Sequence, residues 1–244
     1  MRAAIGLVNG LFVFVLGVVS ALWFGMRYAW PHRRLPDGER ELRANEAARR
    51  WSAFIVDDLL AVRVAHLTPL PDLPGRGVLI VANHRSWLDP MLIMACTGSN
   101  GLSKGSIGRI PFVGYFGRLT GAVFFDRMNP DDRARARAEV RRLLRAGCRL
   151  LVFPEGTRTR DGRIGKRPSM RLIEDAWVDG LPVLPCAVRD TERVISLAPP
   201  GAHRREACAV WWGTVCDPAT FASAEAFSAV VWAQVLTHAE SGRD

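Results

Sequence analysis

Cysteine is scarce in this sequence, with five residues among 244, and no two of them form a C-x-x-C pair. An odd number of cysteines cannot all pair with one another, and the missing spacing argues against a zinc site. Most of them lie within apolar runs, where a free thiol behaves as a small hydrophobic side chain. We therefore predict a protein of a reducing compartment, with neither a disulfide framework nor a metal site.

Lysine is almost absent, since only Lys104 and Lys166 occur, and arginine carries nearly all of the positive charge. The chain has 33 Lys and Arg residues against 24 Asp and Glu residues, which gives a net charge of +9. Arginine suits the bidentate recognition of phosphate and carboxylate groups. This balance indicates an anionic partner, and nucleic acid, an acidic lipid surface and a phosphorylated small molecule all fit it.

Charge is missing altogether between Ala3 and Met26, a stretch long enough to cross a hydrocarbon core of ~30 Å as a helix. A cleaved signal peptide has a shorter apolar region, of about 7–15 residues. Several arginines follow this stretch, whereas only Arg2 precedes it. We predict a transmembrane or membrane-inserted helix over residues 1–30, in the inner membrane, with the bulk of the chain on the cytoplasmic side.

Two further regions follow the apolar stretch. Residues 31–70 contain a predicted amphipathic helix, from Glu39 to His66, and a linker, because apolar residues recur there at helical spacing. In residues 71–244, helical patterns alternate with short apolar runs at 77–83, 121–126, 149–153, 182–188 and 207–215. This alternation predicts an α/β domain, in which helices flank a mostly parallel central sheet.

Three polar residues stand just past predicted strands. His84, Arg127 and Glu155 each follow one of the apolar runs within a few residues. Ligands of open α/β sheets collect beyond the carboxyl ends of the strands. We therefore expect these three side chains at one edge of the sheet, around a common site.

The segment NHRSWLDP (83–90) allows two roles for its aspartate. Asp89 before Pro90 predicts a helix N-cap with proline at the first helical position. His84 and Asp89 can also meet where the chain turns from strand to helix. The carboxylate would then accept the hydrogen of one imidazole nitrogen and leave the other nitrogen as a base. The two roles are compatible, and the spacing alone proves neither.

Two other segments carry groups that bind anions. GAVFFDR ends on Arg127, which is either half of a surface ion pair or a ligand for an anion. FPEGTR follows a strand as an irregular turn, in which Gly156 permits a close approach of the backbone to a ligand. Glu155 can accept a hydrogen bond from a hydroxyl or hold Arg158, and Arg158 can bind a phosphate through two N–H groups.

In this order and spacing, NHRSWLD, GAVFFDR, FPEGTR and LPVLPCAV resemble the four sequence blocks of the 1-acylglycerol-3-phosphate O-acyltransferase family. The resemblance runs from about Gly77 to Val188, and membrane-attached helices before it are usual in the family. Members transfer a fatty acyl group from a thioester, acyl-CoA or acyl-carrier protein, to a lipid hydroxyl. The resemblance implies an O-acyltransferase whose residues 71–244 form the acyltransferase domain.

The resemblance also implies roles for particular residues. His84 would be the general base, and Asp89 would orient it. A second set would bind the phosphate-bearing acceptor: Lys104, Arg127, Glu155, Gly156, Thr157 and Arg158. Lys104 belongs to this set because many members place a lysine before an I-P-x-x-G turn. The implied acceptor is a lysophospholipid, namely 1-acyl-glycerol-3-phosphate, which would give phosphatidic acid.

One departure from the family concerns the acceptor. Many members continue after FPEGTR with an aromatic residue, a lysine and a glycine, but this sequence reads RIGKRPSMRLIE there. The missing F-K-x-G pattern keeps other acceptors open, an ornithine-type or a glyco-lysolipid. It bears on the identity of the acceptor more than on the type of reaction.

The expected reaction needs no metal ion or bound cofactor, because a thioester is already activated. A positioned base that takes the proton of the attacking alcohol contributes ~10²–10⁴-fold. Ser86 is not expected to carry the acyl group, since the G-x-S-x-G motif is absent, and the alcohol would attack directly. Acyl-CoA or acyl-carrier protein would enter as a co-substrate, and membrane lipids are the other expected partner.

Two interpretations from other classes are weaker. The segment DDRARARAEVRRLLRAG would suit a membrane-tethered nucleic-acid binder, but the sequence has no recognisable binding motif and no clustered stacking aromatics. We therefore expect no nucleic-acid partner, and we expect this helix to face solvent or lipid headgroups. A catalytically silent lipid-binding protein is disfavoured by the pair of His84 and Asp89, since binding alone requires no base.

Overall fold

The computed structural model describes residues 2–158, 168–197 and 200–240, and the elements and contacts below belong to these ranges. The main sheet contains seven strands: β1 (Arg63–His66), β2 (Val78–Ala82), β3 (Asn100–Lys104), β4 (Val123–Phe125), β5 (Arg149–Val152), β6 (Val183–Arg189) and β9 (Ala207–Trp212). A separate hairpin consists of β7 (Ile195–Leu197) and β8 (Pro200–Ala202).

The order of the main sheet is β1-β9-β6-β2-β5-β3-β4. The five strands from β6 to β4 run parallel to one another. β9 is antiparallel to β6 and pairs in parallel with β1 at the edge. The predicted mostly parallel sheet is confirmed, and the carboxyl ends of its five parallel strands meet at one edge.

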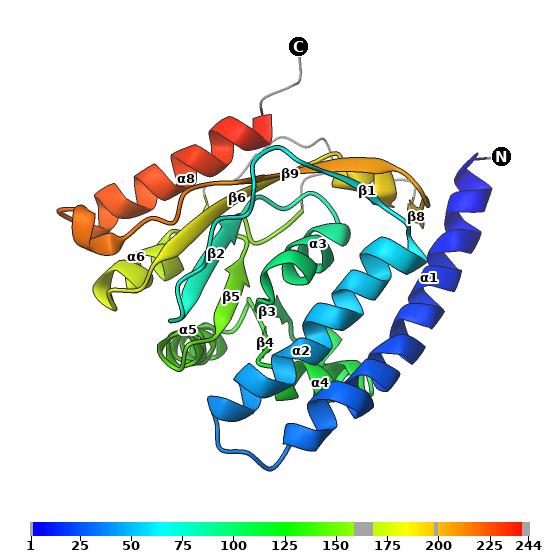
Figure 1. Cartoon of the computed structure of the whole chain (residues 1–244), viewed down its shortest axis with the longest axis horizontal. Coiled ribbons are helices and arrows are strands. Elements are labelled where there is room, and N and C mark those ends of the chain that lie inside the picture. The colour runs from blue at the N-terminus through cyan, green and yellow to red at the C-terminus, as the bar shows by residue number, and fades with distance from the viewer. Residues whose placement is uncertain (1, 159–167, 198–199, 241–244) are drawn as a thin grey trace.

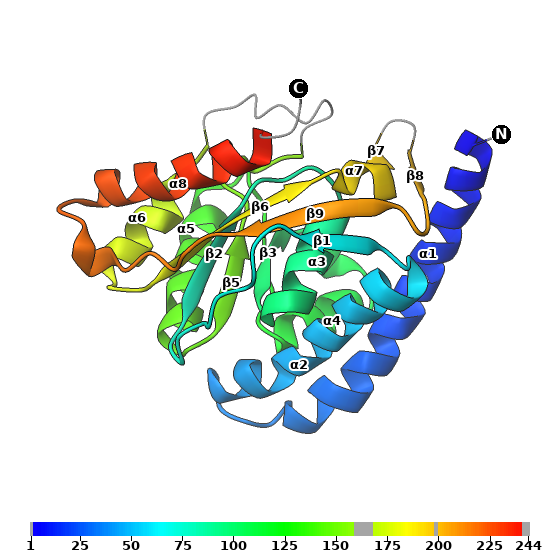
Figure 2. The same cartoon turned by 45° about the horizontal axis from the view of Figure 1, so that its top comes forward.

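Helices cover both faces of this sheet. They are α1 (Arg2–Phe24), α2 (Glu39–Ala53), α3 (Leu88–Thr97), α4 (Val113–Leu119), α5 (Pro130–Arg145), α6 (Arg171–Val178), α7 (Thr191–Val194) and α8 (Ala224–Glu240). Short π-helical or 3₁₀ turns are η1 (Gly25–Ala29), η2 (Trp30–His32), η3 (Phe54–Leu59), η4 (Ile107–Arg109) and η5 (Pro218–Thr220). Figures 1 and 2 show α5, α6 and α8 on one side of the sheet, with α2 and α3 on the other.

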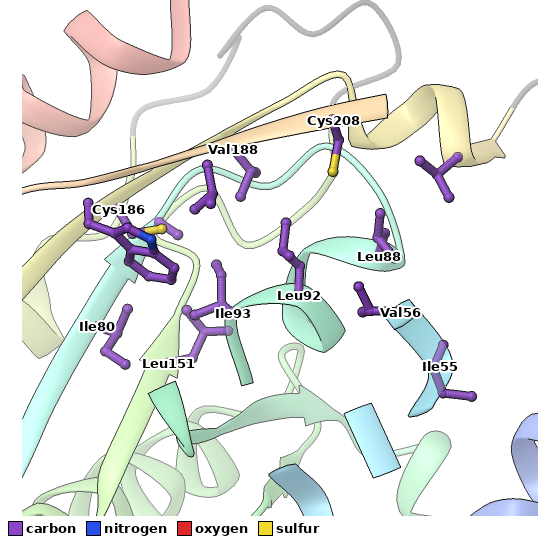
Figure 3. Packing of buried hydrophobic residues seen from close by; sticks show 14 of the residues in the cluster. Ile55, Val56, Ile80, Leu88, Leu92, Ile93, Leu151, Cys186, Val188 and Cys208 are labelled. Atoms are coloured by element: carbon purple, nitrogen blue, oxygen red, sulfur yellow. The ribbon is translucent and has the colours of Figure 1, made fainter. Parts of the chain in front are cut away.

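The core lies on both faces of β2, whose five residues are all fully buried. Leu79 and Val81 pack into the layer of α5, α6 and α8, whereas Ile80 faces the layer of α3. In Figure 3, Ile93 of α3 lies beside Leu151 of β5, and both belong to the same buried cluster as Ile80 of β2. A strand buried on both faces needs apolar residues at every position, which explains the unbroken run VLIVA.

The amphipathic helix predicted from Glu39 to His66 is shorter in the structure. α2 ends at Ala53, η3 continues to Leu59, and the last four residues of the prediction form β1. β1 pairs with β9, so its backbone groups are satisfied by a ladder instead of a helix. The helical prediction for this end was wrong because the partner strand, β9, lies far along the chain. The spacing of apolar residues within residues 39–66 carries no information about such a distant partner.

The apolar N-terminal helix is confirmed. Gly6–His32 is long and apolar enough to cross a membrane, with a mean hydropathy of 2.2. It lies along the domain, since Gly10 approaches the backbone of β8 and the Gly17 carbonyl accepts a hydrogen bond from Trp51 Nε1 at 3.1 Å. We call its other side the exposed apolar face of α1: Leu7, Val8, Leu11, Phe12, Phe14, Val15, Val19 and Trp23.

The arginine-rich helix α5 forms where the sequence predicts it, and most of its arginines make ion pairs within the protein. Arg137 makes an ion pair with Asp175, while Arg141 and Arg145 both lie 2.5 Å from Asp179. Both aspartates belong to α6 or to the residue that follows it. Three arginines of α5 thus share two carboxylates in or next to α6, which leaves less of the positive charge of α5 for an external anion.

Candidate active site

The NHRSWLDP segment, which we call the histidine loop, begins at the end of a firmly held strand. β2 ends at Ala82, and Asn83 prolongs the pairing with β6 through its side chain. The Asn83 amide donates to the Val188 carbonyl at 3.0 Å, and its oxygen accepts from the Val188 N–H at 2.8 Å. His84 is therefore the first residue beyond the sheet, at the edge where ligands of parallel sheets gather.

The imidazole of His84 is held from two sides. Nδ1 lies 2.7 Å from Asp89 Oδ2, and the ring stacks on Phe153 with 4.0 Å between ring centroids. The Asp89 side chain is fully buried, whereas 14% of the His84 side chain is exposed. Among the described residues, Nε2 of this ring has no hydrogen-bond partner. The geometry leaves Nε2 as the nitrogen that can take up a proton.

The N-cap role predicted for Asp89 is wrong. α3 begins at Leu88, so Asp89 lies inside its first turn. The carboxylate accepts instead from the backbone N–H groups of Arg85 and Ser86, at 2.5 and 2.8 Å. These amides precede the helix, because the histidine loop curls back around the aspartate. The backbone N–H of Leu88 binds the Ser86 hydroxyl at 2.9 Å, so that serine satisfies a helix-terminal donor.

Glu155 supports the histidine loop from the turn that follows β5. The residue is 8% exposed, and its Oε1 accepts from the backbone N–H of His84 at 2.7 Å. Burial raises the pKa of Glu155 to about 7, and the nearby charge of Asp89 acts in the same direction. At neutral pH, Glu155 is therefore protonated in a fraction of the molecules. The contact to His84 is what the structure shows, and a contact of Glu155 with the acceptor stays a prediction.

Two arginines meet at the turn after Glu155. Arg158 lies over the Trp87 ring at 4.1 Å from its centroid, and its buried Nη1 has no hydrogen-bond partner among the described residues. Arg127 Nη1 lies 3.9 Å from where a Cβ on Gly156 would be. Burial and the neighbouring charge of Arg127 lower the pKa of Arg158. Both guanidinium groups stay charged at neutral pH and can bind one anionic group between them.

Gly156 itself has a φ of +66°, a left-handed conformation that glycine adopts without strain. This conformation turns the chain so that Glu155 points to the histidine loop while Arg158 reaches Trp87. The sequence expectation that His84, Arg127 and Glu155 gather at one edge therefore holds in space.

Lys104 and Thr157 are exposed at the same edge. Lys104 ends β3, which pairs with β5, and Thr157 immediately precedes Arg158. Within the described ranges, no hydrogen bond or ion pair joins either side chain to the rest of the site. Their role as ligands of the acceptor stays a prediction.

Two residues that follow β6 belong to the site and were not predicted from the sequence. Thr191 donates a hydrogen bond to Asp89 Oδ1, and Glu192 makes a bidentate ion pair with Arg85 at 2.8 and 2.6 Å. The rule that functional groups follow parallel strands points to these positions too, because they come after the predicted strand at 182–188. Neither residue belongs to a recognisable motif, so local sequence gave no further indication.

Metal ligands were not predicted for this chain. The five cysteines are free thiols, and the described ranges contain no group of three or more His, Cys, Asp or Glu side chains that could hold a metal ion. Independence of the reaction from metal ions and bound cofactors stays a prediction.

Known proteins resemble this chain in sequence over most of its length. A family model described as Acyltransferase matches residues 61–189, more than half of the chain. A probable 1-acyl-sn-glycerol-3-phosphate acyltransferase of Mycoplasma pneumoniae is 29% identical over 75% of this chain and 69% of its own. A lyso-ornithine lipid O-acyltransferase of Pseudomonas aeruginosa is 31% identical over 71% of this chain and 63% of its own.

One solved structure has a similar fold over almost the whole length of both chains. The 1-acyl-sn-glycerophosphate (LPA) acyltransferase PlsC of Thermotoga maritima superimposes with a TM-score of 0.78 at 25% identity, covering 98% of this chain and 97% of that one. Other relatives are longer: the chain spans 53% of the chloroplastic 1-acyl-sn-glycerol-3-phosphate acyltransferase LPAT1 of Arabidopsis thaliana.

Proposed function

Because the chain belongs to the acyltransferase family, we propose that it transfers a fatty acyl group from a thioester to the free hydroxyl of a lysophospholipid. The acceptor we infer is 1-acyl-glycerol-3-phosphate, which becomes phosphatidic acid, and the donor is acyl-CoA or acyl-carrier protein. The observation that carries this proposal is the 2.7 Å contact between His84 Nδ1 and Asp89 Oδ2, which leaves Nε2 uncommitted.

In the proposed reaction, His84 Nε2 takes the proton of the acceptor hydroxyl as its oxygen attacks the thioester carbonyl. A carbon–oxygen bond forms, and the tetrahedral intermediate collapses with cleavage of the carbon–sulfur bond. The departing sulfur takes the proton from the imidazolium, so the products are an ester and a free thiol. The Asp89 carboxylate holds the hydrogen on Nδ1 and stabilises the positive charge that the ring carries in between.

The two arginines of the site suit the phosphate of the acceptor. Arg127 and Arg158 meet beside Gly156, and neither side chain has an ion pair within the described ranges. A phosphate between them would form charge-assisted hydrogen bonds with both arginines. It would also give Arg158 Nη1 the hydrogen-bond partner that it lacks. With the phosphate held there, the hydroxyl of the glycerol is presented toward His84, which orients the reacting groups.

A lyso-ornithine lipid is the second candidate acceptor. The F-K-x-G pattern is missing after FPEGTR, and the Pseudomonas relative carries the name of a lyso-ornithine lipid acyltransferase. The chemistry at His84 would be the same, but the anionic group to be held would differ.

In the deciding experiment, the purified protein is incubated with labelled acyl-CoA or labelled acyl-carrier protein. Each reaction contains one acceptor, either 1-acyl-glycerol-3-phosphate or a lyso-ornithine lipid. We expect labelled phosphatidic acid from 1-acyl-glycerol-3-phosphate. Label found only in ornithine lipid would select the second candidate. No acylated lipid with any acceptor and either donor would overturn the proposed function.

A further inference from the structure

The corner between β6 and α7 closes over the back of the histidine loop. β6 and β2 are parallel neighbours, so both strands deliver their next residues to the same edge. The Asn83 side chain locks this register through both backbone groups of Val188. Thr191, two residues after the end of β6, is fully buried and contacts Asp89 of the histidine loop.

The two oxygens of the Asp89 carboxylate have different partners. Oδ2 binds His84 Nδ1 and the backbone N–H groups of Arg85 and Ser86. Oδ1 accepts from the Thr191 hydroxyl at 2.5 Å, and its other contact, with the Ser86 hydroxyl, measures 3.5 Å. Thr191 is therefore the close donor that fixes the far oxygen and with it the plane of the carboxylate.

The neighbouring residue of α7 holds the same loop at a second point. The Arg85 side chain is buried, and its guanidinium forms a bidentate pair with Glu192. Arg85 is adjacent to His84 in the chain, so this pair restrains the backbone on which the histidine stands. A bidentate pair fixes orientation as well as distance.

The backbone at the corner adopts a conformation that supports this arrangement. Asp190 has a φ of +61° and a ψ of 9°, in the left-handed region that residues other than glycine seldom occupy. Such conformations persist where surrounding contacts impose them, and they gather at functional sites. Here the left-handed turn is what reverses the chain after β6 and points Thr191 at Asp89.

We propose that Thr191 is a positioning residue of the acyl transfer: its hydroxyl fixes the Asp89 carboxylate in the plane that aligns His84. This inference rests on the proposed function. Thr191 touches neither substrate in this scheme and acts only through Asp89, with the pair of Arg85 and Glu192 restraining the same loop.

The test compares Thr191→Val, Thr191→Ser and Thr97→Val as full-length protein. Valine keeps the volume of threonine and removes the donor, whereas serine keeps the hydroxyl. We expect kcat to fall about tenfold in Thr191→Val, as for the loss of one hydrogen bond to a charged group, with both KM values nearly unchanged. Thr191→Ser should recover most of the activity.

Thr97→Val is the matched control, because Thr97 is also buried and its hydroxyl donates to the Ile93 carbonyl at 2.7 Å, on α3. It should keep the kcat of the original chain. A folded Thr191→Val with undiminished kcat, a Thr191→Ser no better than Thr191→Val, or an equal loss in Thr97→Val would each overturn the inference. If Thr191→Val does not fold, Thr191→Ala is compared with Thr191→Ser in its place.

A spectroscopic measurement separates this inference from the proposed function. The Nδ1 proton of His84, bound to a buried carboxylate, should give a low-field proton NMR resonance that disappears in His84→Ala. We expect Thr191→Val to shift or broaden this resonance and Thr97→Val to leave it in place. An unmoved resonance in Thr191→Val would refute the positioning role even if acyl transfer is demonstrated. A moved resonance would support it even if the acceptor proves to be different.

Discussion

His84 is the residue on which the proposed chemistry depends most directly. Replacing it with alanine removes the base and should reduce acyl transfer by about 10²–10⁴-fold, since a positioned base contributes that much. Asp89→Asn should retain part of the activity, because the imidazole remains although the carboxylate no longer fixes its orientation.

Both variants are assayed with labelled donor, after circular dichroism has shown native folding. His32→Ala serves as a control outside the site, and normal turnover in His84→Ala would exclude the base role.

Arg127 and Arg158 should act on the acceptor and not on the donor. Each alanine variant loses a charge-assisted contact worth about 1.5–3 kcal/mol, so the KM of a phosphate-bearing acceptor should rise about 10–100-fold. The KM of the acyl donor should stay close to its original value. Arg76→Ala, whose side chain binds the Gly180 carbonyl instead, is the matched control. A rise confined to the donor would assign these arginines to the other substrate.

Glu155 should make stability depend on pH. Burial raises its pKa from 4.5 to about 7. Between these two pH values the folded protein therefore keeps a proton on Glu155 that the unfolded chain has already lost. Stability therefore falls as pH rises through this range. Glu155→Gln cannot ionise and still offers an oxygen to the His84 N–H. Its Tm should exceed that of the original chain by a margin that grows from about pH 5 to pH 8. The exposed Glu240→Gln should show no such trend, and a constant margin for Glu155→Gln would contradict the raised pKa.

Much of the site could be anticipated residue by residue. The strand-end rule and the motif spacing placed His84, Arg127 and Glu155 at a single edge. The N-cap role of Asp89 failed because the dipeptide with Pro90 is compatible with more than one position in a first helical turn. Thr191 was not found, since threonine after a strand is common and only the pairing of β6 with β2 shows what it faces.

At the scale of elements, α5 and α6 are joined by ion pairs that the sequence displays only as an excess of arginine. Asp179 holds both Arg141 and Arg145, and its own side chain is 3% exposed. Asp179→Asn should lower the free energy of unfolding by about 1–3 kcal/mol, because charged hydrogen bonds are weakened. A drop in Tm of about 2–4 °C per kcal/mol is expected for a chain of this size. The exposed Asp72→Asn is the control, and an unchanged Tm in Asp179→Asn would show that these pairs add no stability.

Elements with an unbroken apolar run were predictable, whereas short polar ones were not. The run that contains β2 was recognised because burial on both faces demands continuous apolar residues. β1 (RVAH) and β3 (NGLSK) carry no such run, and their strand conformation is fixed by pairing with β9 and β5. The extent of a strand at a sheet edge is thus decided by its neighbour more than by its own residues.

For the whole molecule, the position of α1 bears on how we expect the protein to contact a membrane. The helix contacts β8 near its start and α2 further along, so a complete crossing of the bilayer would draw parts of the domain into the hydrocarbon. Insertion of the exposed apolar face of α1 into one side of the bilayer avoids that cost. The arrangement therefore favours partial insertion over a span.

Substitutions on that face test the membrane contact without removing the helix. Leu11→Gln together with Val15→Gln should leave Tm nearly unchanged, because these side chains are 67% and 49% exposed, and should lower recovery with vesicles in flotation. Val230→Gln, on α8 and 42% exposed, is the matched control and should float normally. Undiminished flotation of the double variant would place the membrane contact on another surface. Any part of the binding due to arginine should weaken with added salt.

The contacts that hold the histidine loop also set the order in which activity can appear during folding. Glu155, Val188, Thr191 and Glu192 reach this loop from 71, 105, 102 and 107 residues away in the chain. Contacts of such separation close large loops and are slow to form. In a refolding experiment, helical content should therefore return well before acyl transfer does. A chain that stops before residue 182 retains both His84 and Asp89, yet it should remain inactive at every refolding time.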